Sequence, residues 1–281
     1  MELNGANPSK NVVTIIPARY ASTRLPGKML LPISGKPLIL HTLAQAAKAE
    51  TVSRVIVATD DERIFDVVSV SGGEAVMTAS SHVSGSDRVA EVAEGLPDGS
   101  IVVNVQGDEP TISPATIDRA VAAIVNDENA DMSTTWERFD TVSELMNGNN
   151  VKIVVGDDGY ALYFSRSPMP WPRTAALRYG GDATVAIERE PDLLSNFRKH
   201  TGLYVYRREY LLKFMKMPPT RLEGFEMLEQ LRALENGARI RVVESAATSI
   251  GVDTIEDLER VRELLEQNGG PGSIFKIQEE T

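Results

Sequence analysis

The feature of this sequence that most constrains its fold is an alternation of short apolar segments with helix-like segments in the first half of the chain. Apolar, β-rich segments occupy residues 12–16, 54–59, 74–78 and 101–105, and helical patterns follow at about 37–50, 61–71, 86–94 and 114–126. Continuous apolar strands are typical of a parallel sheet that is covered on both faces. We therefore predict an α/β fold with a doubly wound, mostly parallel sheet.

The second half of the chain is less regular and predicts a smaller elaboration of this sheet. A hairpin is expected over 152–156 and 161–165, followed by a Pro-rich loop at 165–173, and residues 174–198 match no pattern. Further strands are expected at 202–207 and 239–243, and helices at 208–216, 221–235 and 254–267. We expect one domain over residues 1–268, in which about 150–206 forms the elaboration, and a flexible tail over 269–281.

Composition excludes several classes of function. The chain of 281 residues has 29 basic and 40 acidic residues, and its net charge of −11 opposes non-specific binding to nucleic acid or to an anionic membrane. The lack of cysteine excludes disulfides, thiol catalysis and Cys-based zinc sites. The first residues lack the apolar core of a signal peptide and no run of 18 apolar residues follows, so we expect a soluble, cytoplasmic protein without membrane insertion.

A cluster of cations follows the first predicted strand of this acidic protein. Arg19, Arg24 and Lys28 lie in a loop that contains Gly27, at the strand end where doubly wound sheets bind ligands. The loop matches neither GxxxxGK[ST] nor GxGxxG. Its cations and free backbone N–H groups are suited to phosphate, so we expect phosphate binding here; the alternative is a solvated loop with ordinary surface cations.

Two acidic segments are expected near the same edge of the sheet. Asp108 and Glu109 follow the fourth apolar segment in QGDEP, and adjacent carboxylates there suggest a hard cation such as Mg²⁺. Asp108 could equally cap the turn beside Gly107. Asp253 precedes the predicted helix at 254–267, and the spacing leaves open whether it is a second metal ligand or the N-cap of that helix.

Several long segments together resemble one enzyme family, the 3-deoxy-manno-octulosonate cytidylyltransferases (CMP-Kdo synthetases). The resemblance spans about residues 11–265 and is carried by IIPARYASTRLPGKMLLPISGKPLILH, VIVATDDERI, VMTASSHVSGSDRVAEVA, VNVQGDEPTISP, ALYFSRSPMP, HTGLYVYRREYL, EMLEQLRALENG and GVDTIEDLERV. It implies a nucleotide-diphosphosugar-transferase-like, Rossmann-like fold in a Mg²⁺-dependent homodimer. The implied reaction transfers CMP from CTP to the anomeric hydroxyl of the sugar acid Kdo, with release of pyrophosphate, for lipopolysaccharide biosynthesis.

The resemblance also implies roles for individual residues. Arg19, Lys28, Asp108 and Asp253 match catalytic positions, and the two aspartates match the metal ligands. The implied nucleotide-binding residues are Arg19, Ser22, Arg24, Lys28, Ser86 and Asp87. The implied sugar-binding residues are Arg88, Gln106, His200, Glu229 and Gln230. No side-chain base is apparent, so we expect orientation and charge neutralisation to contribute most to catalysis.

Some positions depart from the family pattern and keep the exact acceptor open. Thr201 stands where an apolar residue is expected, and the loop over 174–198 has no pattern that carries over from the family. These two departures leave room for an 8-amino-3,8-dideoxy Kdo or for another 2-keto-3-deoxy sugar acid such as sialic acid. Ser86 replaces a threonine but keeps the hydroxyl. A glycosyltransferase of related fold and a non-catalytic nucleotide-binding protein are rival classes.

Glu229 is expected at the border of the apolar face of one continuous helix over 221–235.

Overall fold

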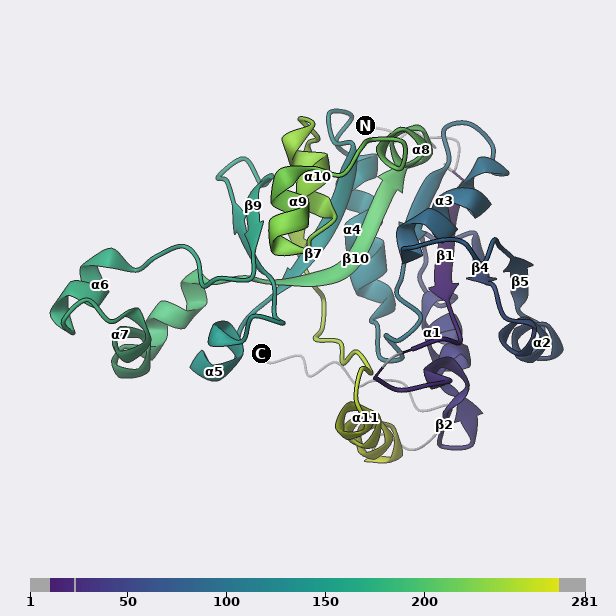
Figure 1. Cartoon of the computed structure of the whole chain (residues 1–281), viewed down its shortest axis with the longest axis horizontal. Helices are drawn as coiled ribbons and strands as arrows, with labels where there is room; N and C mark the ends of the chain where they lie inside the picture. Colours follow the sequence, from purple (N-terminus) through teal and green to yellow (C-terminus); the bar gives the residue numbers. More distant parts are fainter. Residues whose placement is uncertain (1–10, 23, 268–281) are drawn as a thin grey trace, which may run out of the picture.

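A mixed β-sheet forms the centre of the computed structural model, which describes residues 11–22 and 24–267 (Figure 1). Within these residues the sheet has nine strands, seven of them in the order β11-β7-β10-β6-β1-β4-β5, while β8 pairs with β10 and β9. The strands are β1 (Val12–Ala18), β4 (Arg54–Thr59), β5 (Glu74–Met77), β6 (Ile101–Asn104), β7 (Met132–Glu137), β8 (Lys152–Val155), β9 (Ala161–Ser165), β10 (Lys199–Arg207) and β11 (Ile240–Glu244).

Most strand pairs in the central part of the sheet are parallel, as predicted. Strand β1 is parallel to β4 and β6, β4 is parallel to β5, and β11 is parallel to β7. Strand β10 runs antiparallel between β6 and β7. This reversal brings the first residues of β10 to the sheet edge at which the parallel strands end, so residues from distant parts of the chain meet there.

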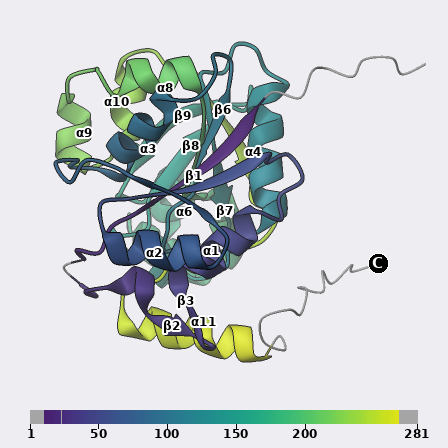
Figure 2. The ribbon, with the colours of Figure 1, turned by 90° about the vertical axis from the view of Figure 1, so that its right-hand side faces the viewer.

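Helices cover both faces of the sheet because the side chains of the central strands alternate between two apolar cores. On β1, Val12 and Ile16 belong to one core, whereas Val13 and Ile15 belong to the other. Figure 2 shows α3, α8, α9 and α10 together on one side of β1 and α4 on the other. The helices on the two faces are α1 (Leu38–Ala46), α2 (Glu62–Val70), α3 (Gly85–Glu94), α4 (Pro114–Val125), α8 (Arg208–Phe214), α9 (Arg221–Glu226) and α10 (Gln230–Glu235). Helix α11 (Ile255–Gln267) lies beyond the end of the sheet, at the bottom of Figure 1.

The expected hairpin is present as β8 and β9, and the chain beyond it forms a projection, of which the sequence left residues 174–198 unassigned. Residues 166–198, here called the arm, extend away from the sheet at the left of Figure 1. The arm contains α6 (Arg173–Arg178), α7 (Ala183–Arg189) and the 3-10 helix η2 (Pro191–Asn196), and α5 (Val142–Met146) lies beside it. Near the first strand the chain forms η1 (Lys28–Leu30) and a small sheet of β2 (Pro32–Ile33) and β3 (Lys36–Pro37).

The prediction of one continuous helix over 221–235 is wrong. Helix α9 ends at Glu226, Met227 adopts a left-handed backbone with φ 55°, and α10 begins at Gln230. Phe225 is 85% exposed, whereas Gln230 is buried. The break therefore changes which side chains face the sheet. The predicted tail over 269–281 lies outside the described residues.

Candidate active site

The loop after β1 bends so that Lys28 turns inward while Arg19 stays exposed. Gly27 has a φ of 68°, and its N–H donates to the carbonyl of Tyr20 at 3.2 Å. A side chain at position 27 would come within 3.1 Å of the Tyr20 hydroxyl oxygen. The positive φ favours glycine at this position, and the contact with Tyr20 leaves little room for a side chain. Within the same loop, Ser22 Oγ accepts a hydrogen bond from Leu25 N at 3.3 Å.

Lys28 lies between the two aspartates that the sequence indicates as metal ligands. Its Nζ is 2.6 Å from Asp108 Oδ2 and 3.0 Å from Asp253 Oδ1. Arg24 pairs with the second oxygen of Asp253 at 2.9 Å. Burial alone would lower the pKa of the Lys28 ammonium, but Asp108 and Asp253 outweigh this effect and raise the pKa above its ordinary value. Lys28 and Asp253, which are 225 positions apart in sequence, thus form one cluster with Arg24 and Asp108.

Asp253 is not the cap of α11, so one of the two alternatives left open by its position is excluded. Thr254 Oγ1 accepts from Asp257 N at 3.2 Å, and the Asp257 carboxylate accepts from Thr254 N at 2.9 Å. This reciprocal pair satisfies the start of the helix. The Asp253 carboxylate is therefore left to face Lys28 and Arg24.

Close backbone packing fixes the position of Asp108 relative to Asp253. A Cβ at Gly107 would lie 2.9 Å from the carbonyl oxygen of Pro17, so this position admits no side chain without movement of β1. The Gly107 carbonyl accepts from the buried Thr42 hydroxyl at 2.9 Å, and the Asp108 carbonyl accepts from Val252 N at 2.8 Å. Through the Val252 contact the two acidic loops are joined directly.

The donor chemistry of Asp108 and Asp253 fits Mg²⁺. Both carboxylates reach the same ammonium atom, so their oxygens converge on one cationic position. Hard cations take carboxylate oxygens together with phosphate oxygens and water. Among residues 11–22 and 24–267, no group of three or more His, Cys, Asp and Glu side chains is arranged to hold a metal ion. Phosphate and water would therefore have to supply the remaining ligands.

The three candidates at the start of α3 all have partners within the protein. Ser86 Oγ donates to Glu229 Oε2 at 2.5 Å, and the Asp87 carboxylate accepts from Ser84 N at 2.9 Å in a capping box. Arg88 is only 3% exposed and donates to Asp60 at 2.9 Å and to the Thr78 hydroxyl. Contacts of these side chains with nucleotide or sugar acid stay predictions.

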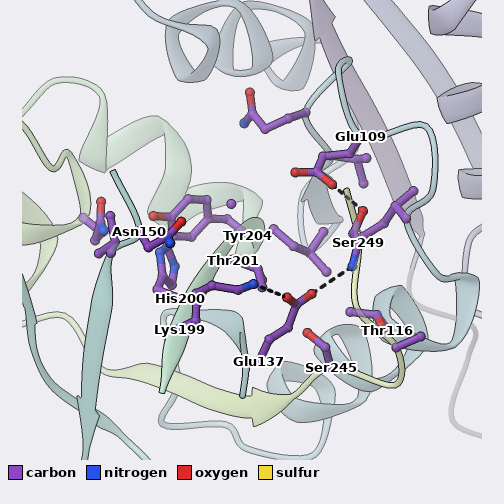
Figure 3. A pocket seen from close by; sticks show the side chains of 18 of the residues that line it. Glu109, Thr116, Glu137, Asn150, Lys199, His200, Thr201, Tyr204, Ser245 and Ser249 are labelled. Atoms are coloured by element: carbon purple, nitrogen blue, oxygen red, sulfur yellow. Dashed lines mark hydrogen bonds and ion pairs between the residues drawn. The ribbon is translucent and has the colours of Figure 1, made fainter. Parts of the chain in front are cut away.

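A cavity of about 400 Å³ with mixed polar and apolar walls lies beside the cluster of Lys28, Asp108 and Asp253. Three sequence-predicted residues line it: Gln106, His200 and Gln230 (Figure 3). His200 Nε2 lies 2.9 Å from Thr134 Oγ1, and the ring packs edge-on against Phe164. Burial lowers the pKa of His200 to about 3, so the imidazole is neutral at physiological pH. The cavity thus brings amide and imidazole groups together near Asp108.

Glu229 is not among the residues that line the cavity. One carboxylate oxygen accepts from Ser86, and the other is 3.2 Å from Arg232. Burial raises the pKa of Glu229 above its ordinary value, while Ser86 and Arg232 oppose the rise. Glu229 therefore links α3 to α10.

Sequence reasoning assigned no role to three further polar residues of the cavity: Glu137, Lys199 and Ser249. Glu109, which the sequence indicated beside Asp108 as a carboxylate suited to a hard cation, also lines this cavity. The Glu109 carboxylate accepts from the Ser249 hydroxyl, and burial, reinforced by the charges of Asp108 and Glu137, raises its pKa to about 7. Glu137 could not have been found from the sequence, because its strand has no apolar pattern.

Comparison with known proteins decides the family. Residues 13–240 match the model of a family described as cytidylyltransferase. The chain is 52% identical over 255 residues to the 3-deoxy-manno-octulosonate cytidylyltransferase of Geobacter sulfurreducens, covering 91% of this chain and 99% of that protein. A protein of the same name from Solibacter usitatus is 44% identical over 255 residues, covering 91% of this chain and 94% of that protein. This chain belongs to the 3-deoxy-manno-octulosonate cytidylyltransferase family.

Solved structures agree with this family and with the predicted fold class. A structure of CMP:2-keto-3-deoxy-manno-octonic acid synthetase complexed with CTP superposes with a TM-score of 0.81 at 39% identity, covering 92% of this chain and 99% of that chain. The 4-diphosphocytidyl-2C-methyl-D-erythritol synthase of Anaerococcus prevotii shares the fold, with a TM-score of 0.58 at 14% identity and coverage of 92% and 97%. The predicted α/β fold and family are thereby confirmed. No helix among the described residues is long and apolar enough to cross a bilayer.

Proposed function

We propose that this chain transfers CMP from CTP to the anomeric hydroxyl of Kdo and releases pyrophosphate. The observation that carries the proposal is the convergence of Lys28 and Arg24 with Asp108 and Asp253 beside a cavity that polar side chains enter. Membership of the family supports the same reaction. A sheet edge with cations for phosphate, acids for a metal and an adjacent space for a polar acceptor has the parts that nucleotidyl transfer needs.

The cations of the loop are proposed to neutralise the triphosphate and the departing pyrophosphate. Arg19 is exposed at the end of β1, while Arg24 and Lys28 are already paired with acids. Charge on the phosphates grows as the α-phosphorus bond to pyrophosphate breaks, so positive groups that face this point stabilise the transition state more than the ground state. In this account Lys28 turns from the acids toward the phosphates when CTP is bound.

Asp108 and Asp253 are the residues that would hold Mg²⁺. Bound there, Mg²⁺ would neutralise phosphate charge and lower the pKa of the attacking hydroxyl. The chain supports these two acids through the backbone contact between Asp108 and Val252 and through the separate capping pair at Thr254. The loops that carry both aspartates are thus fixed by other groups, and neither carboxylate is needed to cap a turn or a helix.

The sugar acid is proposed to occupy the cavity lined by Gln106, His200 and Gln230. A neutral imidazole and two amides suit hydroxyl groups, because each offers both hydrogen-bond donors and acceptors. These side chains would hold the acceptor beside Asp108, so that its hydroxyl is already oriented toward the bound CTP when it attacks.

The biological setting is also part of the proposal. We place the reaction in the cytoplasm, where CTP is available, and in the supply of activated Kdo for lipopolysaccharide. A homodimer is supported by exposed apolar side chains on and beside the arm: Leu162, Trp171 and Leu177 are 62%, 59% and 63% exposed. Apolar groups exposed on a projecting segment are suited to contact with a second subunit.

A pyrophosphate-release assay tests the reaction. The expected result is release that requires CTP, Mg²⁺ and Kdo together, with little release when EDTA replaces Mg²⁺. A panel with 8-amino Kdo and sialic acid measures preference among acceptors. Release at equal rates without any sugar acid would indicate hydrolysis of CTP and contradict the proposed transfer.

A further inference from the structure

One wall of the cavity is an ion pair to which neither the family resemblance nor the proposed chemistry gives a role. Lys199 and Glu137 lie directly opposite each other on the antiparallel strands β10 and β7. Lys199 Nζ is 3.2 Å from one carboxylate oxygen of Glu137, and the other oxygen accepts from Ser249 N at 3.0 Å. The two side chains are 17% and 6% exposed, and both line the cavity.

The position of this pair relative to the acids distinguishes two ends of the cavity. Gln106 and Glu109 flank Asp108 closely in sequence, so they mark the end nearest the reacting groups. Figure 3 shows Glu109 and Glu137 on opposite sides of Ser249, each joined to it by a dashed line. The Lys199–Glu137 pair is thus separated from Glu109 by Ser249.

An acceptor must place its anomeric hydroxyl near Asp108 and Asp253, so the rest of the molecule extends away from them. In Kdo the far end is a two-carbon tail with two hydroxyl groups. A cavity of about 400 Å³ has room for such a small sugar acid. The tail would then meet Lys199 and Glu137, with Asn150 and Ser245 also in the lining.

The chemistry of the pair suits a diol. An ammonium has three donors and a carboxylate has several acceptor positions, so the internal contacts of Lys199 and Glu137 leave capacity for further hydrogen bonds. Neighbouring hydroxyls both donate and accept. A buried ion pair is weak evidence for stability, because removing two charges from water costs much of what their attraction provides. The presence of this pair is therefore explained better by recognition of a polar ligand than by a contribution to the stability of the fold.

We infer that the Lys199–Glu137 pair binds the hydroxyl tail of the acceptor and selects acids that possess it. This inference rests on the proposed function and deepens it by naming specificity residues. Lys199 donates to tail oxygens, and Glu137 accepts from tail hydroxyls while it holds Lys199 in place.

Acceptor length provides the test. Two acids are compared: Kdo, and a six-carbon 2-keto-3-deoxy acid that closes the same ring in the same configuration without the tail. The double variant Lys199→Met/Glu137→Leu removes both charges together, so no lone charge is left buried. We expect kcat/KM for Kdo to fall at least tenfold while the value for the six-carbon acid stays within twofold, because that acid never reaches the pair. An acid that is not turned over is scored by its competitive inhibition constant.

The single variant Glu137→Gln and a matched pair outside the cavity make the result specific. Glu137→Gln keeps shape and most hydrogen bonding, and it should reduce the preference for Kdo by a smaller factor. Arg54→Met/Glu74→Leu removes a cross-strand ion pair between β4 and β5 and should leave the preference unchanged. Equal losses for both acids, or a Kdo preference within twofold of wild type in the double variant, would overturn the inference. If the wild-type protein released no pyrophosphate from CTP with Kdo or with the six-carbon acid, that result would instead contradict the proposed function.

Discussion

At the scale of single residues, Lys28 has two sets of possible partners, the acids that it contacts and the phosphates that it is proposed to meet. We expect Lys28→Met to lower kcat/KM for CTP by roughly a hundredfold, a magnitude typical of losing one group that stabilises developing charge. Affinity for CMP should change less than about threefold, because CMP lacks the β- and γ-phosphates. Steady-state kinetics and calorimetry measure the two quantities. Lys36→Met, in the adjacent β3, is the control, and equal losses for CTP and CMP would place Lys28 elsewhere.

Asp253 and Thr254 are neighbours with different expected functions. Asp253→Asn should reduce turnover by orders of magnitude and raise the Mg²⁺ concentration needed for half-maximal rate, because the ligand loses its charge. Thr254→Ala should cost about 1 kcal/mol of unfolding free energy through the lost cap of α11, with turnover nearly unchanged. Kinetics at varied Mg²⁺ and urea unfolding separate the two effects. Wild-type turnover of Asp253→Asn at limiting Mg²⁺ contradicts the assignment.

His200 gives a pH dependence whose sign follows from its burial. Its pKa is about 3 in the folded chain against an ordinary value of 6.5, so between these pH values the unfolded chain binds more protons. The free energy of unfolding therefore falls as pH decreases through this window. Relative to wild type, His200→Gln should gain up to about 3 kcal/mol between pH 7 and pH 4. Urea unfolding at both pH values measures the gain, and a constant difference between the two proteins would show that burial does not suppress the charge.

The candidate site could be predicted from the sequence as far as single motifs carry the information. Lys28, Asp108 and Asp253 each follow or flank a recognisable element, and the structure brings them together. The partner of Arg88 could not be foreseen, because the pairing with Asp60 depends on how α3 packs against the end of β4. Burial and pairing of this kind are properties of tertiary packing, which local patterns do not encode.

At the scale of elements, the sequence missed β7 and overestimated one helix. Strand β7 reads MSTTWE and lacks an apolar run, yet it lies between β10 and β11. Its hydroxyls are satisfied inside the protein: Ser133 donates to the Ala120 carbonyl at 2.6 Å and Thr134 to the Leu203 carbonyl at 2.8 Å. Hydroxyl side chains can thus be buried in a central strand when neighbouring carbonyls accept from them.

The break between α9 and α10 leads to a stability prediction. Met227 is 76% exposed and holds a positive φ, so its side chain contributes little packing while its backbone is strained. Met227→Gly should raise the unfolding free energy by about 0.5–1 kcal/mol over Met227→Ala, which removes the same side chain but keeps the strain. Chemical denaturation of both variants measures this difference. A less stable glycine variant would argue against a strained turn at this position.

At the scale of the whole molecule, the parallel core was predictable and the arm was not. The core follows from alternating apolar strands and amphipathic helices, whose pattern is local. The arm has short helices, Pro-rich connections and apolar groups that face outward, so it shows no periodic burial for the sequence to reveal. The conformation of such a segment depends on the surface that packs against its exposed apolar groups.

In the proposed homodimer, the second subunit packs against the exposed apolar groups of the arm. We expect wild type to sediment as a dimer and Leu177→Glu, on α6, to shift the population toward monomer, because a buried charge without a partner disfavours an interface. Val70→Glu places the same charge on α2, at a residue that is 89% exposed, and should remain dimeric. Analytical ultracentrifugation at several concentrations distinguishes these states. A monomeric wild type, or dimers in both variants, would contradict the proposed interface.

The central claim is that a sugar oxygen attacks the α-phosphorus of CTP at the cluster formed by Lys28, Asp108 and Asp253. Its most direct test is mass spectrometry of the products formed from CTP, Mg²⁺ and Kdo labelled with ¹⁸O at the anomeric hydroxyl. The account predicts one CMP-Kdo per pyrophosphate, with the label retained in the bond between sugar and phosphorus, and loss of this product in Asp108→Asn. Unlabelled CMP without a CMP-sugar, or labelled product formed at the wild-type rate by Asp108→Asn, would contradict it.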